Sequence, residues 1–152
     1  MAHSEGLALF CRVGSCLCAL PLEHVIETMR PMPVEPLAGT TPLVSGLAII
    51  RGAPVPVLHA RELLGSERAN PGRFVTVRVG KRQVALAVDS VLSVGTLPRG
   101  SLHELPPLLR DAGAEAISSI GALDADLLLV LRSARLVPED LWSQLGPEGS
   151  RS

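Results

Sequence analysis

Residues 7–20 have the sequence LALFCRVGSCLCAL, the clearest structural pattern in the chain. Two apolar arms flank Gly14-Ser15, which predicts a β-hairpin with a two-residue turn. Such a turn pairs Cys11 with Cys18 and Val13 with Cys16. Because alternate residues of a strand share a face, these apolar side chains then lie together: Leu9, Cys11, Val13, Cys16, Cys18 and Leu20. We expect this face to point into a core, with the cysteines as small buried hydrophobic groups.

A second hairpin is predicted from strands over residues 74–79 and 83–88 with a turn at 80–82. One of its faces is apolar as well: Val75, Val77, Val79, Val84, Leu86 and Val88. A shift of 66 residues aligns the two hairpins, and six of the 14 positions from Arg12 to Val25 are then identical. Chance or shared turn chemistry could give this similarity, but it favours two related β units in one chain.

The remaining apolar runs are short and bounded by proline or glycine, which predicts strands with few and short helices. Further strands are expected within residues 47–58, where Gly52 indicates a tight turn or bulge, and over residues 117–123 and 127–131. Pro54 and Pro56 lack backbone N–H groups on one side, so their strand should lie at a sheet edge or pair on its other side only. Short helices are expected over three segments: 60–64, 108–112 and 138–145.

Length and composition limit the class of protein. The chain has 152 residues, which suits one domain over 7–146 between tails 1–6 and 147–152. A net charge of −1 gives no attraction to nucleic acid or an anionic membrane. No apolar run is long enough for a transmembrane helix, and Glu5 and Arg12 argue against a signal peptide. Three cysteines within eight residues favour a reducing compartment, so we expect a cytoplasmic protein.

Catalytic motifs are missing from the sequence. It has no phosphate-binding glycine loop, no Gly-x-Ser-x-Gly motif and no second histidine at metalloprotease spacing after His103-Glu104. A small metal protein or enzyme using Cys11, Cys16 and Cys18 is an alternative, but a fourth ligand near these residues is lacking. We therefore expect no enzyme activity, no cofactor and no metal.

Five motifs follow one another along the chain: VIE at 25–27, Pro-x-x-x-Gly at 42–46, GLAIIRGAPVPVLH at 46–59, VDSV at 88–91, and IGA with LVL at 120–122 and 129–131. In this order they resemble the CheW family, the adaptors of bacterial chemotaxis, over about residues 7–137. The resemblance implies an all-β fold of two intertwined five-stranded SH3-like β-barrels. The two hairpins agree with that fold.

The resemblance also implies a function. Family members have no active site, and they contact the regulatory domain of a CheA-type histidine kinase through one barrel. They bind the cytoplasmic tip of a methyl-accepting chemoreceptor in a groove near the other barrel. The expected function is therefore a scaffold or adaptor that couples receptor to kinase.

By resemblance, partner-binding residues are Val25, Glu27, Ile49, Arg51, Gly52, His59 and Asp89. Each also has a structural interpretation. Arg51 could be a turn residue that satisfies backbone carbonyls, and Glu27 could be a solvated surface charge. For Asp89 a turn-capping role is favoured over partner contact. His59 could titrate near neutral pH, although a surface or turn position is the simpler expectation.

Several positions depart from the family pattern. Ile49 replaces an asparagine, His59 an aspartate, Cys18 an aromatic residue and Ser119 a glycine. The loop at 65–73 is about three residues short. These departures leave open an alternative function, a divergent accessory protein that binds the receptor but not the kinase.

Overall fold

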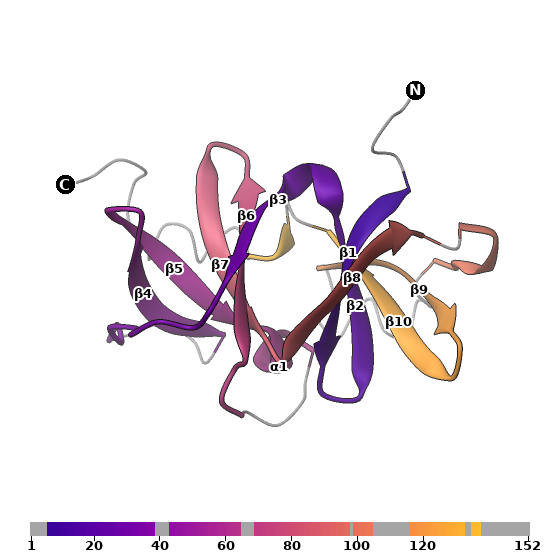
Figure 1. The fold of residues 1–152 in the computed structure, drawn as a ribbon, viewed down its shortest axis with the longest axis horizontal. Helices are drawn as coiled ribbons and strands as arrows, with labels where there is room; N and C mark the ends of the chain where they lie inside the picture. The colour runs from indigo at the N-terminus through magenta and orange to yellow at the C-terminus, as the bar shows by residue number, and fades with distance from the viewer. Residues whose placement is uncertain are drawn as a thin grey trace.

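The computed structural model describes residues 6–38, 43–64, 69–97, 99–104, 116–132 and 135–137. Within these ranges the chain forms two five-stranded sheets (Figure 1). Sheet A has the order β8 (Ser90–Thr96), β1 (Leu7–Val13), β2 (Cys16–Pro21), β10 (Asp126–Leu131), β9 (Ile117–Leu123). Sheet B has the order β3 (Val25–Met29), β6 (Arg73–Val79), β7 (Arg82–Val88), β5 (Ala53–His59), β4 (Val44–Ile50).

The remaining described elements are short. They are the α-helix α1 (Ala60–Leu63) and the 3-10 helices η1 (Leu22–His24) and η2 (Arg99–Ser101). The helix predicted over 60–64 is therefore confirmed, ending one residue early. The helices predicted over 108–112 and 138–145 lie outside the described residues, as do the tail at 147–152 and residues 1–5.

Both predicted hairpins are confirmed. In the first, Cys11 pairs with Cys18 and Val13 with Cys16, as the two-residue turn requires. In the second, Val79 pairs with Arg82, so the turn is also two residues long and β7 begins one residue earlier than predicted.

The two sheets exchange strands. β3 follows the β1–β2 hairpin of sheet A but pairs with β6 in sheet B, and β8 follows the β6–β7 hairpin of sheet B but pairs with β1 in sheet A. In addition, β10 runs parallel to β2, and β5 runs parallel to β7. Figure 1 shows β3 and β8 leading from one sheet to the other. The predicted pair of intertwined, related β units is therefore confirmed.

The expectation of an edge position for the proline strand is wrong, because β5 lies between β4 and β7. The missing N–H groups of the two prolines still limit the hydrogen bonding of this strand. Pro54 and Pro56 pair with β4, whereas the pairing with β7 begins only at Val57. The half of β5 that contains the prolines is thus paired on one side, which was the other possibility that their missing N–H groups left open.

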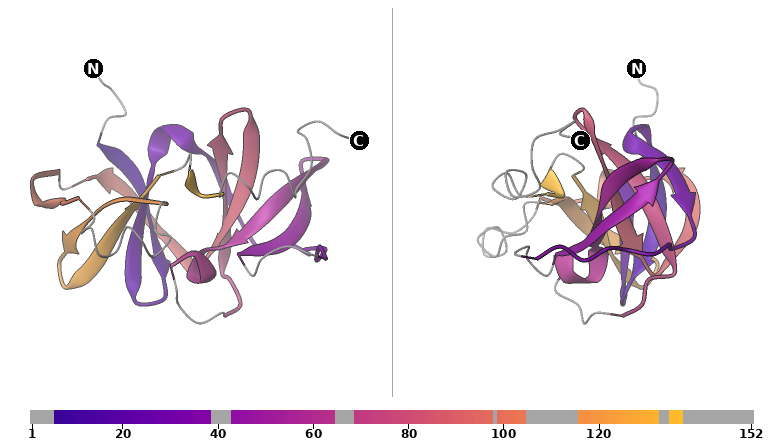
Figure 2. Two further views of the ribbon diagram at one scale, coloured as in Figure 1. Left: turned by 180° about the vertical axis from the view of Figure 1, so that it is seen from behind. Right: turned by 90° about the vertical axis from the view of Figure 1, so that its left-hand side faces the viewer.

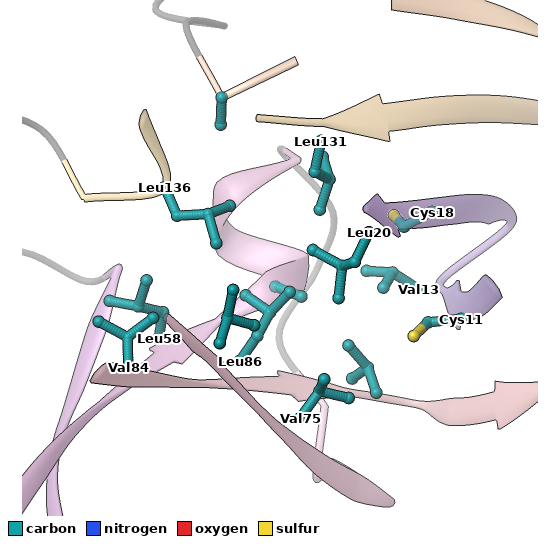
Figure 3. Close-up of a cluster of buried hydrophobic side chains, with 14 of the residues drawn as sticks. Cys11, Val13, Cys18, Leu20, Leu58, Val75, Val84, Leu86, Leu131 and Leu136 are labelled. Carbon is teal, nitrogen blue, oxygen red and sulfur yellow. The ribbon is translucent and has the colours of Figure 1, made fainter. Parts of the chain in front are cut away.

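The hydrophobic core has three parts. The largest lies between the sheets, and both hairpins supply it through the apolar faces predicted from their alternation; Cys11, Val13, Leu20, Val75 and Leu86 are among its members (Figure 3). Each sheet also encloses a smaller cluster of its own. Phe10 belongs to the cluster of sheet A, and Phe74 to that of sheet B.

The far edges of both sheets are covered by irregular segments. Glu35 forms a bridge with Leu47 of β4, and His103 forms a bridge with Ile120 of β9. Gly46 makes the first approach possible, because a Cβ at this position would overlap the Glu35 carbonyl oxygen. These two edges lie at opposite ends of the molecule (Figure 2). None of the described helices has the length and apolar character needed to span a membrane.

Candidate functional site

The β4–β5 hairpin turns at Arg51-Gly52, where both residues have positive φ angles, 55° and 82°. Two successive positive φ angles are typical of the type I′ turn, whose twist suits an antiparallel hairpin. Glycine adopts this conformation freely, whereas it is uncommon for arginine. The strand pair Ile50 and Ala53 closes the turn. Arg51 is thereby held at the hairpin tip, with 77% of its side chain exposed.

Arg51 forms a bidentate ion pair with Glu27. Its Nε donates to Oε2 at 2.9 Å, and its Nη2 donates to Oε1 at 2.7 Å. Glu27 lies on β3 and Arg51 follows β4, the two outer strands of sheet B. The pair therefore links the two opposite edges of sheet B, which have three strands between them. Paired, parallel hydrogen bonds give a guanidinium–carboxylate contact both strength and direction.

The ion pair also favours the charged form of both groups. Hydrogen bonding to Arg51 lowers the pKa of the Glu27 carboxyl below its ordinary value, and hydrogen bonding to Glu27 raises the pKa of the Arg51 guanidinium. Both groups are thus charged near neutral pH. Because the Arg51 side chain is largely exposed, salt will screen the attraction.

A β-bulge in β3 determines where Glu27 points. Val25 and Glu27 pair with adjacent residues of β6, so Ile26 is the extra residue. One inserted residue reverses the alternation of faces along a strand. Val25 accordingly packs against the core between the sheets, whereas Met29 packs against the cluster of sheet B. The bulge turns Glu27 to the same side as Met29.

Exposed apolar side chains flank the ion pair. Ile26, next to Glu27, is 39% exposed, and Ile49, two residues before Arg51, is 64% exposed. We call these residues, together with Gly52, the candidate site: Ile26, Glu27, Ile49, Arg51 and Gly52. Four of the seven predicted partner-binding residues are among them, and Val25 lies beside them, half-buried.

The other two predicted residues lie at the junction of the sheets. His59 ends β5 and is 7% exposed. Asp89 lies between β7 and β8, and its carboxylate accepts two hydrogen bonds from Arg61 and one from the Gly14 N–H. The Arg61 hydrogen bonds are the main reason that the pKa of Asp89 is lowered. Partner contact by His59 and Asp89 stays a prediction, and their burial leaves little side chain for it.

The cysteines give no sign of a metal centre. Cys11 and Cys18 are fully buried, and Cys16 is half-buried. Burial raises the pKa of the Cys11 thiol to about 12 and raises that of Cys18 as well, so both stay protonated near neutral pH. Across the part of the chain that the structure describes, no group of three or more His, Cys, Asp or Glu side chains is placed to hold a metal ion.

Three residues with a role in or near the site were not predicted from the sequence: Ile26, Arg61 and Thr76. Thr76 left a signal, because a threonine inside the apolar strand at 74–79 predicts a buried hydroxyl that needs a partner. Ile26 left none, since a one-residue bulge does not alter local composition. Arg61 left none either, because its partner Asp89 lies 28 residues away.

Known proteins resemble this chain in sequence and in structure. Residues 7–140 match the model of the CheW-like domain. Protein FrzA of Myxococcus xanthus is 33% identical over 115 residues, which cover 73% of this chain and 71% of FrzA. The crystal structure of the scaffolding protein TtCheW from Thermoanaerobacter tengcongensis is similar with a TM-score of 0.76. It covers 88% of this chain and 93% of TtCheW at 18% identity, a likeness of fold that confirms the predicted all-β architecture.

Proposed function

Because the chain belongs to the CheW-like family of chemotaxis scaffold proteins, we propose that it is an adaptor that couples a methyl-accepting chemoreceptor to a CheA-type histidine kinase. Members of this family are non-enzymatic scaffolds, so the proposed activity is binding. An adaptor of this kind works in the cytoplasm, where the receptor tip and the kinase meet. Two interfaces of moderate strength suffice, since simultaneous binding of linked partners multiplies weak contacts.

We propose the candidate site as the contact for the receptor tip, and the Glu27–Arg51 ion pair is the observation that carries this proposal. The pair uses two of the five N–H donors of the Arg51 guanidinium. The remaining donors can bind acceptors on a partner while Glu27 fixes the direction of the side chain. Ile26 and Ile49 add apolar surface on either side, and an arginine beside exposed apolar residues is typical of interface centres.

For the kinase regulatory domain we propose a separate surface on sheet A. The outer strand β8 exposes Leu92 and Val94 at 49% and 54%. Every residue of β8 is uncharged, so this edge has no charged group that would oppose an apolar contact. Two partners can then bind without competing, one on each sheet.

The experiment is a binding titration of purified protein against two fragments, the receptor tip and the kinase regulatory domain. Arg51→Glu sets two carboxylates against each other at the site, so receptor binding should weaken about tenfold or more. Kinase binding should not change. Arg78→Glu is the matched control. Arg78 is also exposed, on β6, and its replacement by glutamate changes the net charge by the same amount. Unchanged receptor binding by Arg51→Glu would remove the assignment of the site.

The accessory protein that binds only the receptor is the second candidate. The burial of His59 favours it, because the family's aspartate at this position is replaced by a side chain that is 7% exposed. The same titration separates the two functions. Binding of the wild-type chain to both fragments identifies a coupling adaptor, and binding to the receptor tip alone identifies the accessory protein.

A further inference from the structure

We propose that Thr76 is a positioning residue for the candidate site: its hydroxyl clamps the backbone of Glu27 in the β3 bulge and so aims the Glu27 carboxylate at Arg51. The effect on receptor binding rests on the proposed function, whereas the effect on the ion pair does not. The geometry of the ion pair can be tested without a partner.

The hydroxyl of Thr76 makes two hydrogen bonds, both to the same residue. Oγ1 accepts from the Glu27 N–H at 3.2 Å and donates to the Glu27 carbonyl oxygen at 3.2 Å. Thr76 is 0% exposed. It lies on β6 two residues from Phe74 and pairs with Ala85, and both belong to the apolar cluster of sheet B. In such surroundings a hydroxyl requires partners, and Glu27 supplies both.

Sheet A shows that the bulge does not require this hydroxyl. The shift of 66 residues that aligns the hairpins places Ile26 on Leu92, Glu27 on Ser93 and Thr76 on Phe10. β8 carries a bulge at the equivalent position, where Leu92 is the extra residue and Ser93 pairs with Phe10. Phe10 therefore occupies the position in sheet A that Thr76 occupies in sheet B, and the bulge forms there without a hydroxyl. The Thr76 hydroxyl is specific to the sheet in which the residue after the bulge carries the site's carboxylate.

The clamp matters because a bulge interrupts the regular ladder of hydrogen bonds. The hydroxyl adds two hydrogen bonds at this interruption and so ties the N–H and the C=O of Glu27 to β6. Without it, the Glu27 backbone loses two partners at the point that sets the direction of its side chain. Thr76 therefore acts on Arg51 through Glu27.

The test compares Thr76→Val, which keeps the shape and removes the hydroxyl, with Thr76→Ser, which keeps the hydroxyl. Ser118→Ala is the matched control, because the Ser118 hydroxyl also donates to a backbone carbonyl, that of Val130 in sheet A. The Glu27 carboxyl is titrated by NMR in each variant, and binding to the receptor tip is then measured. Thr76→Val should raise the Glu27 pKa toward its ordinary value and weaken binding about fivefold to tenfold. Thr76→Ser and Ser118→Ala should leave both unchanged.

An unchanged Glu27 pKa in folded Thr76→Val would overturn the proposal. Amide spectra of sheet A report whether the variant is folded. If Thr76→Val does not fold, Thr76→Ala against Thr76→Ser gives the same comparison, because alanine and serine differ only in the hydroxyl. Absence of receptor binding by the wild-type chain would overturn the proposed function alone, and the NMR titration would still decide the role of Thr76.

Discussion

Arg61 and Asp89 form a bidentate ion pair that ties α1 to the segment through which the chain passes from sheet B to sheet A. Arg61 Nε and Nη2 donate to the two carboxylate oxygens at 3.0 and 2.7 Å, and both side chains are 23% exposed. The same carboxylate accepts the Gly14 N–H of the first hairpin turn at 3.0 Å. One side chain thus holds groups from both halves of the molecule at their junction.

Replacement of Asp89 by asparagine should destabilise the protein, because it removes the charge that strengthens three hydrogen bonds. We expect a loss of about 1–2 kcal/mol in the free energy of unfolding, which corresponds to a fall of roughly 2–8 °C in Tm. Differential scanning calorimetry measures both. Asp126→Asn is the matched control, because Asp126 meets Arg12 at 3.4 Å with both side chains at least 33% exposed. Its effect should stay within about 0.5 kcal/mol, and an equal loss in both variants would contradict the role of Asp89.

The stabilisation from Asp89 should depend on pH in the acid range. The pKa of Asp89 is lowered in the folded protein, chiefly by Arg61, from an ordinary value of 3.8. A lowered pKa means that the stabilisation is complete above the ordinary value and is lost as pH falls through the folded-state value. Urea unfolding of the wild-type chain and Asp89→Asn should therefore differ most above about pH 5 and converge below pH 3.8. A difference that grows as the pH falls would be inconsistent with this.

Gly46→Ala should separate the segment around Glu35 from β4. A Cβ at position 46 would overlap the Glu35 carbonyl oxygen, and the backbone φ of +147° disfavours any side chain. We expect a loss of about 3 kcal/mol or more in unfolding free energy, measured by urea denaturation. Gly80→Ala is the control, since its φ is +65° and no atom lies within 4 Å of its added Cβ. That variant should lose only about 1 kcal/mol, and comparable losses would rule out the overlap as the cause.

Thiol reagents should distinguish Cys16 from the other two cysteines. Cys11 and Cys18 are buried, and the raised pKa values of their thiols leave almost no thiolate at neutral pH. In the native protein, one thiol per chain should react with a chromogenic disulfide reagent, and all three should react in urea. Cys16→Ser should abolish the native reaction. Rapid reaction of two or three thiols without denaturant would show that the first hairpin opens readily.

The parts of the fold that could be predicted from the sequence are those that local patterns determine. A two-residue turn sets the register of its hairpin, so the pairing of Cys11 with Cys18 and the two apolar faces followed from alternation alone. The exchange of β3 and β8 had no local signal, because Glu27 pairs with Thr76 far along the chain. It was expected only through the family resemblance. The interior position of β5 was missed because pairing can differ between two halves of one strand.

The candidate site was predicted as separate residues and not as an arrangement. Glu27 and Arg51 were both named, but their ion pair depends on two outer strands of a sheet facing each other, which composition cannot show. Ile26 was missed because the bulge that exposes it is visible only in the register. The burial of His59 was missed for a related reason, since the end of β5 lies under the junction of the sheets.

The strand exchange also sets an order of events on the ribosome. Sheet B is complete once Val88 has emerged, whereas the first hairpin waits for β8 and for β10, which ends at Leu131. At ordinary rates of synthesis the stretch from Val88 to Leu131 takes about 2–9 seconds. During that time β1 and β2 each have an unpaired edge, because β8 and β10 have not yet been made, while their apolar face can already pack against sheet B. The first hairpin to be synthesised is therefore among the last to be paired at its edges, and these unpaired edges are where a chaperone would act.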